Sequence, residues 1–290
     1  MPIAPSELIL NPDGSVYHLH LKPEHIANTV ITVGDPDRVS MVTKHFDSIE
    51  HKVHKREFHT QTGDYKGKRI TVISTGIGTD NIDIVLNELD ALVNIDLKTR
   101  EIKKQHTALD IIRIGTSGAI QEDIPVDSFL ISEYATGFDN LLHFYDSTHI
   151  QKLEISNALI DHLDWDATKS FPYTVKCNTQ LAAKFHNEET IQGFTVTNVG
   201  FYGPQGRVLR LQLQDDTLNE KINSFRFKYL KITNLEMETA GIYGLSELLG
   251  HRAISLNAIL ANRALETFSS KPQETVEQLI THTLQTLSNH

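Results

Sequence analysis

The sequence has few cysteines, no excess of basic residues and no long apolar run. One cysteine, Cys177, among 290 residues excludes an internal disulfide framework and is typical of a reducing compartment. The formal net charge of −10 argues against the basic surface that nucleic acids and anionic membranes require, so we expect neither as a partner. No stretch is long and apolar enough for a membrane span, and the N-terminus lacks a secretory signal pattern. We therefore expect a cytoplasmic protein.

What the chain does have is a repeated alternation of apolar strands, glycine turns and helices. Hydrophobic residues make up 39% of the sequence, which is sufficient for a sizeable core. Strands are predicted at 30–33 and 70–74, each followed by a glycine turn and a helix, and a third strand in 109–120 is expected to end at a corner formed by Gly115–Gly118. The second helix is predicted from one apolar face: Ile82, Val85, Leu86, Leu89, Leu92 and Val93.

The second half of the chain continues this alternation. Further strands are predicted near 128–132, 171–178 and 193–200, then a strand, a helix at 239–249 and another strand. Residues 95–108 are polar and charged and are expected to form a helix end and an exposed connection. The tail is an amphipathic helix that begins near Pro272, with Val276, Leu279, Ile280, Thr283, Leu284 and Leu287 in register. We predict one α/β domain over 1–290 with a covered, largely mixed sheet.

Ligands of such sheets bind at the carboxyl ends of strands, and two of these corners carry arginine. In "VGDPDRV", Gly34 follows a strand and Arg38 lies in the first turn of a helix. This pattern suits an anion, but the simpler interpretation is a helix start with Asp35 as cap and Arg38 paired to a surface acid. Arg113 lies inside the apolar run "IIRIGTSG", where a buried guanidinium needs a negative partner. That partner is either a core acid or a bound anion, helped by Thr116.

Other polar groups are weaker candidates. In "NLEMETA", Glu236 and Glu238 could bind the hydroxyl groups of a sugar, or Glu238 could open the following helix. The turn "STGIG" fails both the dinucleotide and the phosphate-loop patterns. His51, His54 and His59 fit no metal-ligand spacing, so we expect solvated histidines and no metal.

The loop "NVGFYGPQGRVLRL" places an aromatic pair beside an amide and a guanidinium. Phe201 and Tyr202 precede Gln205 and Arg207 within one short segment broken by glycine and proline. Such a loop could be a surface turn. It could also bind a flat ring by its face and read the polar edge of that ring.

Seven motifs, taken in order, resemble the nucleoside phosphorylase family. They are "VGDPDRV", "REF", "STGIG", "RIGTSGAI", "FYGPQGR", "LEMETA" and "NAILANR", and they cover most of the chain. The resemblance implies a mixed β-sheet distorted toward a barrel and flanked by helices. It also implies reversible phosphorolysis of a pyrimidine nucleoside, uridine first, with deoxyuridine and thymidine left open.

The resemblance assigns roles to individual residues. Phosphate would be bound by Gly34, Arg38, Arg113, Thr116 and, from a neighbouring subunit, Arg56. The ribose would lie on Met237 and Glu238, and His18 would reach its 5′-hydroxyl from the same neighbouring subunit. The base would contact the following residues: Phe201, Gln205, Arg207 and Arg263.

Within this set, Arg113, Glu238, Gln205 and Arg207 would act in catalysis. A purine enzyme would carry an aspartate where this chain has Asn262, so a pyrimidine is favoured. The alternatives are a nucleosidase or purine nucleoside phosphorylase of the same fold, or a non-catalytic nucleoside-binding protein.

The resemblance also implies assembly and the absence of a resident cofactor. Homodimers, or hexamers built from dimers, would share active sites between subunits. Inorganic phosphate is a substrate, and no cofactor is expected. A structural alkali ion at Glu57, Ile77 and Asn81 stays open, because "GTDN" replaces a Gly-Pro-Ser turn of the family.

Overall fold

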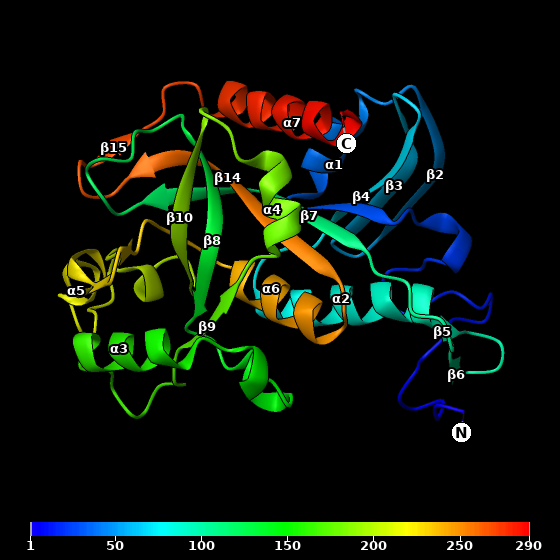
Figure 1. Cartoon of the computed structure of the whole chain (residues 1–290), viewed down its shortest axis with the longest axis horizontal. Helices are drawn as coiled ribbons and strands as arrows, with labels where there is room; N and C mark the ends of the chain where they lie inside the picture. The colour runs from blue at the N-terminus through cyan, green and yellow to red at the C-terminus, as the bar shows by residue number, and fades with distance from the viewer. Residues whose placement is uncertain (1, 290) are drawn as a thin grey trace.

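A computed structural model describes residues 2–289 (Figure 1). Its first layer is a parallel group formed by β1 (Thr29–Val33), β4 (Lys68–Ser74) and β7 (Asp110–Ala119). Every residue of β1 is buried, because β1 lies between two neighbours in the sheet and helices cover its faces. This burial explains the unbroken apolar character of these strands, and it confirms the strands predicted at 30–33 and 70–74.

The sheet closes on itself through five strands. In order around the ring they are β14 (Arg252–Asn262), β8 (Phe129–Gly137), β10 (Thr190–Thr197), β13 (Asn234–Glu236) and β7, which pairs again with β14. β13 pairs with β10 in parallel and with β7 antiparallel, so the ring is mixed. The predicted mixed sheet distorted toward a barrel is therefore confirmed.

The other strands extend this barrel outward. β3 (Phe58–Tyr65) and β2 (Ser48–Lys55) continue the sheet beyond β4 as an antiparallel hairpin, β9 (Tyr173–Lys176) pairs with β8, and β15 (Thr267–Phe268) pairs with β14. The β2–β3 hairpin was not predicted. β2 is an outer strand with mostly polar residues and little buried surface, so its sequence lacks the apolar pattern that indicates a strand. Within 95–108, the expected exposed connection contains a small hairpin of β5 (Ile95–Asp96) and β6 (Glu101–Ile102).

The third strand corrects one prediction. β7 does not end at Gly115 but continues through Gly118 to Ala119. Gly115 is required there by close packing, since a Cβ atom at this position would lie 1.7 Å from Nη1 of Arg113. Gly115 therefore makes room for a side chain inside a strand, and the segment from Gly115 to Gly118 does not form a corner.

Helices cover the two faces of the barrel. Figure 1 shows α7 (Pro272–Ser288) on one side, with α2 (Thr79–Asn94) and α6 (Thr239–Leu248) packed together on the other. The predicted apolar faces of α2 and α7 are buried, with Val93 of α2 half-buried. The remaining helices are α1 (Pro36–Thr43), α3 (Leu153–Leu163), α4 (Thr179–Phe185) and α5 (Leu218–Ser224), with 3-10 turns η1 (Pro23–His25), η2 (Leu141–Phe144), η3 (Thr148–Ile150) and η4 (Gly203–Gln205). A short antiparallel pair, β11 (Arg226–Phe227) and β12 (Leu230–Lys231), follows α5.

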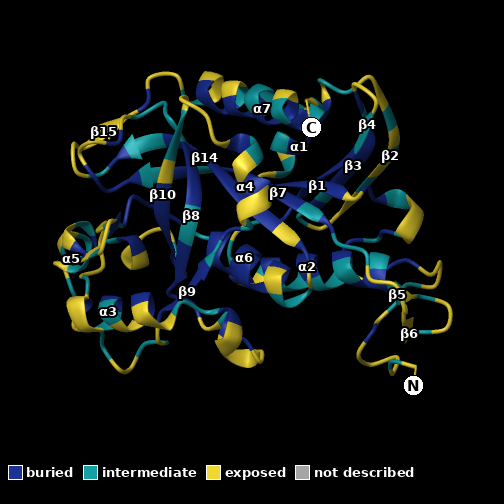
Figure 2. Cartoon of the chain, in the orientation of Figure 1, coloured by how far each residue is buried: buried dark blue, intermediate teal, exposed yellow. Residues whose placement is uncertain are grey.

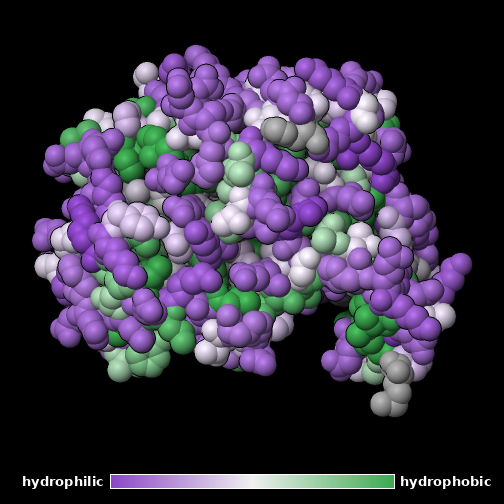
Figure 3. All heavy atoms as spheres, in the orientation of Figure 1, coloured by the Kyte–Doolittle hydropathy of each residue, from purple (hydrophilic) through white to green (hydrophobic). Residues whose placement is uncertain are grey.

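Burial follows this architecture. Figure 2 shows buried residues concentrated in the central strands and on the inner faces of the helices. The surface seen in Figure 3 is mostly hydrophilic, and its hydrophobic atoms lie in separate patches. Across residues 2–289, no helix combines the length and the apolar character needed to cross a membrane.

Candidate active site

A cavity of about 720 Å³ opens where β1, β4 and β13 end. Its walls come from the turns that follow these strands, from the second half of β7 and from the loop that contains η4. Carboxyl ends of strands leave their last backbone groups and the next side chains free for a ligand. The lining residues include nine of the predicted site residues: Gly34, Arg38, Arg113, Thr116, Phe201, Gln205, Arg207, Met237 and Glu238.

Arg113 is the buried charge at the centre of this cavity. Its side chain forms ion pairs with Glu238 at 2.6 Å and with Glu236 at 3.2 Å, and it donates to Oδ1 of Asn257 at 3.0 Å. Burial disfavours the charged form, but the two carboxylates outweigh burial and raise the pKa of Arg113 above its ordinary value. The interpretation in which core acids are the partners of Arg113 is therefore confirmed. Arg113 also lines the cavity, and its binding of an anion there stays a prediction.

The two glutamates have different roles, although they are two residues apart. Glu236 accepts from the backbone N–H groups of Glu238 and Thr239, each at 2.9 Å, so it is the side chain that caps α6. Glu238 does occupy the N-cap position that opens α6, as the alternative predicted, but its side chain makes no cap hydrogen bond. Instead, Glu238 accepts from the N–H of Gly78 at 2.9 Å and from Arg113. Burial raises the pKa of Glu238, and Arg113 opposes that rise.

Arg38 supplies a second guanidinium on the same cavity. Its nearest polar contact is a weak donation from Nη1 to the carbonyl of Ile114 at 3.4 Å, and no carboxylate of residues 2–289 lies within ion-pair distance. Burial and the nearby charge of Arg113 lower the pKa of Arg38. Asp35 caps α1 by accepting from the N–H of Asp37 at 2.9 Å, as the simpler interpretation of that motif held. A half-buried guanidinium without a carboxylate is suited to bind an anion that enters the cavity.

The loop after β10 forms the other end of the cavity. Gln205 is buried at 3% exposure, and its Oε1 accepts from Nη1 of Arg207 at 2.7 Å. The guanidinium of Arg207 lies over the ring of Phe201, with Cζ 3.8 Å from the ring centroid, and Nη1 also donates to the Phe201 carbonyl at 2.6 Å. Gly206, at a φ of +70°, ends η4 and turns the chain from Gln205 to Arg207. An aromatic ring and two polar side chains are therefore held together at this end of the cavity.

Three predicted residues lie outside this cavity. His18 donates from Nδ1 to Glu88 at 2.7 Å, and Arg56 is exposed in the β2–β3 turn, with Cζ 5.9 Å from the centroid of the Tyr17 ring. Arg263 donates to the carbonyl of Gln205, in the loop after β10, at 2.8 Å. The guanidinium of Arg263 supports the backbone of that loop and does not line the cavity, so a direct contact with a base stays a prediction.

The comparisons with known proteins agree with this fold. A family model described as the phosphorylase superfamily matches residues 28–288. The chain belongs to the phosphorylase superfamily. The predicted nucleoside phosphorylase resemblance is confirmed, and the protein is an enzyme of the pentosyltransferase class that uses a nucleoside and phosphate.

Individual phosphorylases are similar over most of their length. The chain is 29% identical over 265 residues to the uridine phosphorylase of Thermococcus kodakarensis, covering 88% of this chain and 80% of that relative. It is 30% identical over 242 residues to the DeoD-type purine nucleoside phosphorylase of Alkaliphilus metalliredigens, covering 82% and 84%. The solved nucleoside phosphorylase of Trypanosoma brucei, reported to show uridine phosphorylase activity, superimposes with a TM-score of 0.87 at 28% identity over 98% of this chain and 100% of that one. Relatives therefore include enzymes for both classes of base.

The phosphorylase cavity also contains residues that sequence reasoning missed. Ser117 and Gly118 line it because β7 continues past Gly115, and Leu260 and Phe268 line it from β14 and β15. A pattern of alternate residues along a longer β7 would have revealed Ser117. Phe268 could not be found this way, since it lies in a two-residue strand.

One group of three side chains in residues 2–289 has the spacing of metal ligands: Asp90, His106 and His251. None of the three lines the phosphorylase cavity. Nδ1 of His251 accepts from the N–H of Leu109 at 3.2 Å, so the proton of a neutral ring is on Nε2, the nitrogen 3.3 Å from Asp90. A protonated nitrogen cannot ligate a metal, and this arrangement is better explained as a buried contact between histidine and aspartate.

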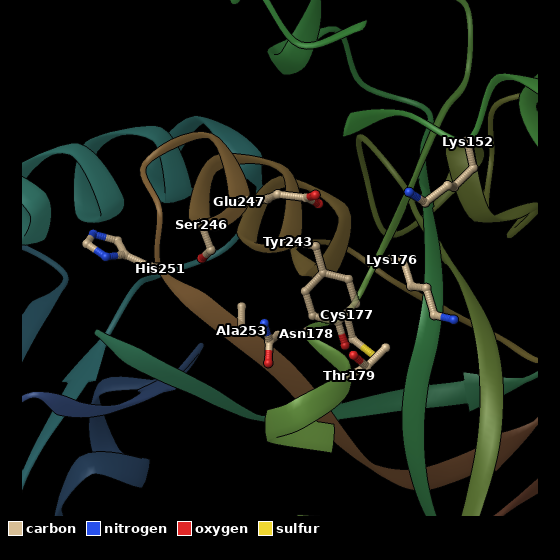
Figure 4. A pocket seen from close by; sticks show the side chains of 10 residues that line it. All are labelled: Lys152, Lys176, Cys177, Asn178, Thr179, Tyr243, Ser246, Glu247, His251 and Ala253. Atoms are coloured by element: carbon tan, nitrogen blue, oxygen red, sulfur yellow. The ribbon is translucent and has the colours of Figure 1, made fainter. Parts of the chain in front are cut away.

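A second, smaller cavity of about 240 Å³ lies between α4 and α6 (Figure 4). It contains none of the predicted site residues, and Cys177 and Tyr243 form part of its wall. Burial raises the pKa of the Cys177 thiol to about 11. A thiol in this state is not a nucleophile at neutral pH.

Proposed function

We propose that the protein is a uridine phosphorylase, which converts uridine and phosphate reversibly into uracil and ribose 1-phosphate. The observation that supports uracil is the arrangement of Gln205 and Arg207 beside the Phe201 ring. An amide and a guanidinium match the alternating carbonyl and N–H groups of a pyrimidine edge. The phosphorylases that resemble this chain include uridine enzymes at 28–29% identity, such as those of Thermococcus kodakarensis and Escherichia coli.

Asn262 supports a pyrimidine over a purine. A purine phosphorylase needs an acid that protonates the departing base, and an amide cannot do this. Here Asn262 is also fully engaged: Nδ2 donates to the carbonyls of Gln121 and Ile124, each at 2.8 Å, and Oδ1 accepts from the N–H of Ala264 at 2.9 Å. Its side chain is therefore tied to the protein and is not available to a base.

In the proposed reaction, phosphate binds between Arg38 and Arg113, near Thr116 and the backbone at Gly34. A phosphate oxygen attacks C1′ of the ribose while the bond from C1′ to N1 of uracil breaks. The electron pair of that bond moves onto uracil, where Gln205 and Arg207 stabilise the charge that collects on the ring oxygens. Glu238 and Met237 hold the ribose, and the negative phosphate stabilises positive charge that develops at C1′. Uracil then takes a proton from water.

We further propose that a second copy of the chain completes each site, in a dimer or in a hexamer of dimers. Glu57 lines the cavity of its own chain, whereas the adjacent Arg56 is exposed and lies outside it. Arg56 lies near Tyr17, whose ring packs edge-on against His18 at 4.8 Å, so both predicted cross-subunit residues lie on one surface. A partner that covers this surface would receive Arg56 at its phosphate and His18 at the ribose 5′-hydroxyl.

A nucleoside panel, incubated with and without phosphate, tests the proposal. Release of uracil from uridine that requires phosphate and yields ribose 1-phosphate is the expected result. Release without phosphate identifies a nucleosidase, and preferential cleavage of inosine or adenosine identifies a purine enzyme. Tight uridine binding without any product identifies a binding protein.

A further inference from the structure

Glu88 of α2 makes four short contacts with the N-terminal segment, all of them to His18 and Leu19. Its Oε2 accepts from the N–H of Leu19 at 2.8 Å, and its two oxygens accept from the N–H of His18 at 2.9 and 3.1 Å. Its Oε1 also accepts from Nδ1 of the His18 ring at 2.7 Å. The carboxylate side chain is 15% exposed, and it joins residues that are 70 positions apart in the sequence.

This contact determines which nitrogen of His18 carries hydrogen. A carboxylate only accepts, so Nδ1 must donate, and a neutral ring then has its lone pair on Nε2. Within residues 2–289, no group forms a hydrogen bond with Nε2, and the His18 side chain is 28% exposed. The ring therefore presents a free acceptor to the outside of its own chain.

The ring is also fixed in direction. The edge of Tyr17 meets His18 at an interplanar angle of 82°, and both backbone N–H groups around the ring are held by the same glutamate. A histidine held from its Nδ1 side, its backbone and one ring face loses little rotational freedom when a ligand binds Nε2.

We propose that Glu88 is a positioning residue, which directs His18 so that Nε2 accepts a hydrogen bond from the 5′-hydroxyl of the nucleoside in the partner's site. This inference rests on the proposed function and on the proposed sharing of sites. Glu88 itself does not touch the substrate. It acts by selecting the tautomer of His18 and by setting the direction of the ring.

A purely structural role for Glu88 is the competing explanation, since three of its four contacts are to the backbone N–H groups of His18 and Leu19. The two roles differ in one respect. A structural defect lowers the turnover of every nucleoside, whereas a positioning defect affects only substrates that have a 5′-hydroxyl for His18 to bind.

The experiment therefore compares uridine with 5′-deoxyuridine, at saturating phosphate, for the wild-type chain, three single variants and one double variant. Glu88→Gln keeps the shape of the side chain but replaces one accepting oxygen by a donor. His18→Ala removes the ring. Asp83→Asn is the matched control on the same helix, because Asp83 contacts Asn87 and the Tyr145 hydroxyl and not the N-terminal segment.

Glu88→Gln is expected to lower kcat/KM for uridine about tenfold, the effect of one lost hydrogen bond to a well-oriented group, and to change it less than about twofold for 5′-deoxyuridine. In the His18→Ala background, Glu88→Gln should cause no further loss of this discrimination. Asp83→Asn should leave both values near wild type.

Equal losses for both nucleosides in Glu88→Gln would overturn the positioning role, and so would a wild-type enzyme that does not distinguish them. In either case phosphate-dependent uracil release would still support the proposed function. Absence of that release in the wild-type chain would overturn both proposals.

Discussion

Arg38 and Arg113 are guanidiniums on the same cavity, yet they suit different experiments. Arg113 neutralises Glu236 and Glu238 in the interior. Its removal leaves two buried carboxylates unpaired, which costs roughly 3–5 kcal/mol of folding stability and obscures any effect on catalysis. Arg38 has no carboxylate partner among residues 2–289, so its removal leaves no buried charge behind.

Replacing Arg38 therefore tests anion binding directly. Arg38→Ala should lower kcat/KM for phosphate by about 10²–10³, because one fixed charge at the transferring group is lost. The melting temperature should change little. Steady-state kinetics with phosphate as the varied substrate, together with thermal unfolding, measure both. Arg69→Ala, which removes a surface arginine paired with Glu50, is the control. Unchanged phosphate kinetics in Arg38→Ala would contradict the anion site.

The reactivity of the Cys177 thiol tests its burial. Burial raises its thiol pKa to about 11, so the thiolate that reacts with alkylating reagents is scarce at pH 8. Iodoacetamide should modify the folded protein at least about 100-fold more slowly than the same chain in denaturant, as followed by intact mass. The rate should rise with pH toward the folded pKa. Rapid alkylation of folded protein at pH 8 would show that the thiol is not buried as described.

At the scale of elements, a buried pair joins the end of β8 to β9. The Tyr173 hydroxyl donates to both oxygens of Asp139, at 2.7 and 2.8 Å, and the N–H of Leu141 donates to Oδ1 at 2.8 Å. Burial raises the pKa of Asp139, and these donors oppose the rise. Because the folded pKa lies above the unfolded one, the folding stability that involves this carboxyl decreases as pH rises through the folded pKa.

Removing the hydroxyl should therefore have a pH-dependent cost. Tyr173→Phe takes away one donor and raises the folded pKa of Asp139 further, so we expect a loss of about 1–3 kcal/mol at a pH above the folded pKa of Asp139 and a smaller loss at a pH below it, where the carboxyl is protonated. Denaturant unfolding at both pH values measures this. Tyr65→Phe is the control, since Tyr65 is buried and its hydroxyl makes no hydrogen bond to a described residue. A loss that does not depend on pH would show that Asp139 does not titrate between folded and unfolded states in this range.

Elements with a clear apolar period could be predicted from the sequence, and elements defined by their neighbours could not. α2, α7, β1 and β4 follow directly from burial on one face or on both. The β2–β3 hairpin was missed because an outer strand needs no apolar alternation. β7 was ended too early, because the glycine that admits the Arg113 side chain looks the same in sequence as a glycine in a turn.

At the scale of the whole molecule, the nine predicted residues that meet in one cavity come from segments between Gly34 and Glu238, and only the closed sheet brings them together. The order of the motifs that contain these residues was sufficient to predict the family. Arg263 lies behind the loop and not in the cavity lining, because neighbouring positions at a strand end differ in direction and sequence alone does not show which side faces the cavity. His18 and Arg56 lie outside the cavity of their own chain, so their roles depend on assembly.

If two chains share each site, two inactive variants should restore activity when they assemble together, which a site within a single chain cannot do. If each site combines Arg38 of one copy with Arg56 of the partner subunit, Arg38→Ala and Arg56→Ala homodimers should both be nearly inactive. In a mixed dimer, one of the two sites receives both substitutions and the other receives neither. A random mixture of the two variants, unfolded and refolded together, should therefore recover about a quarter of wild-type activity, because about half of the dimers are mixed and half of their sites are intact. Refolding each variant separately before mixing is the control. Activity equal to the sum of the parents after joint refolding would mean that Arg56 acts in its own chain or not at all.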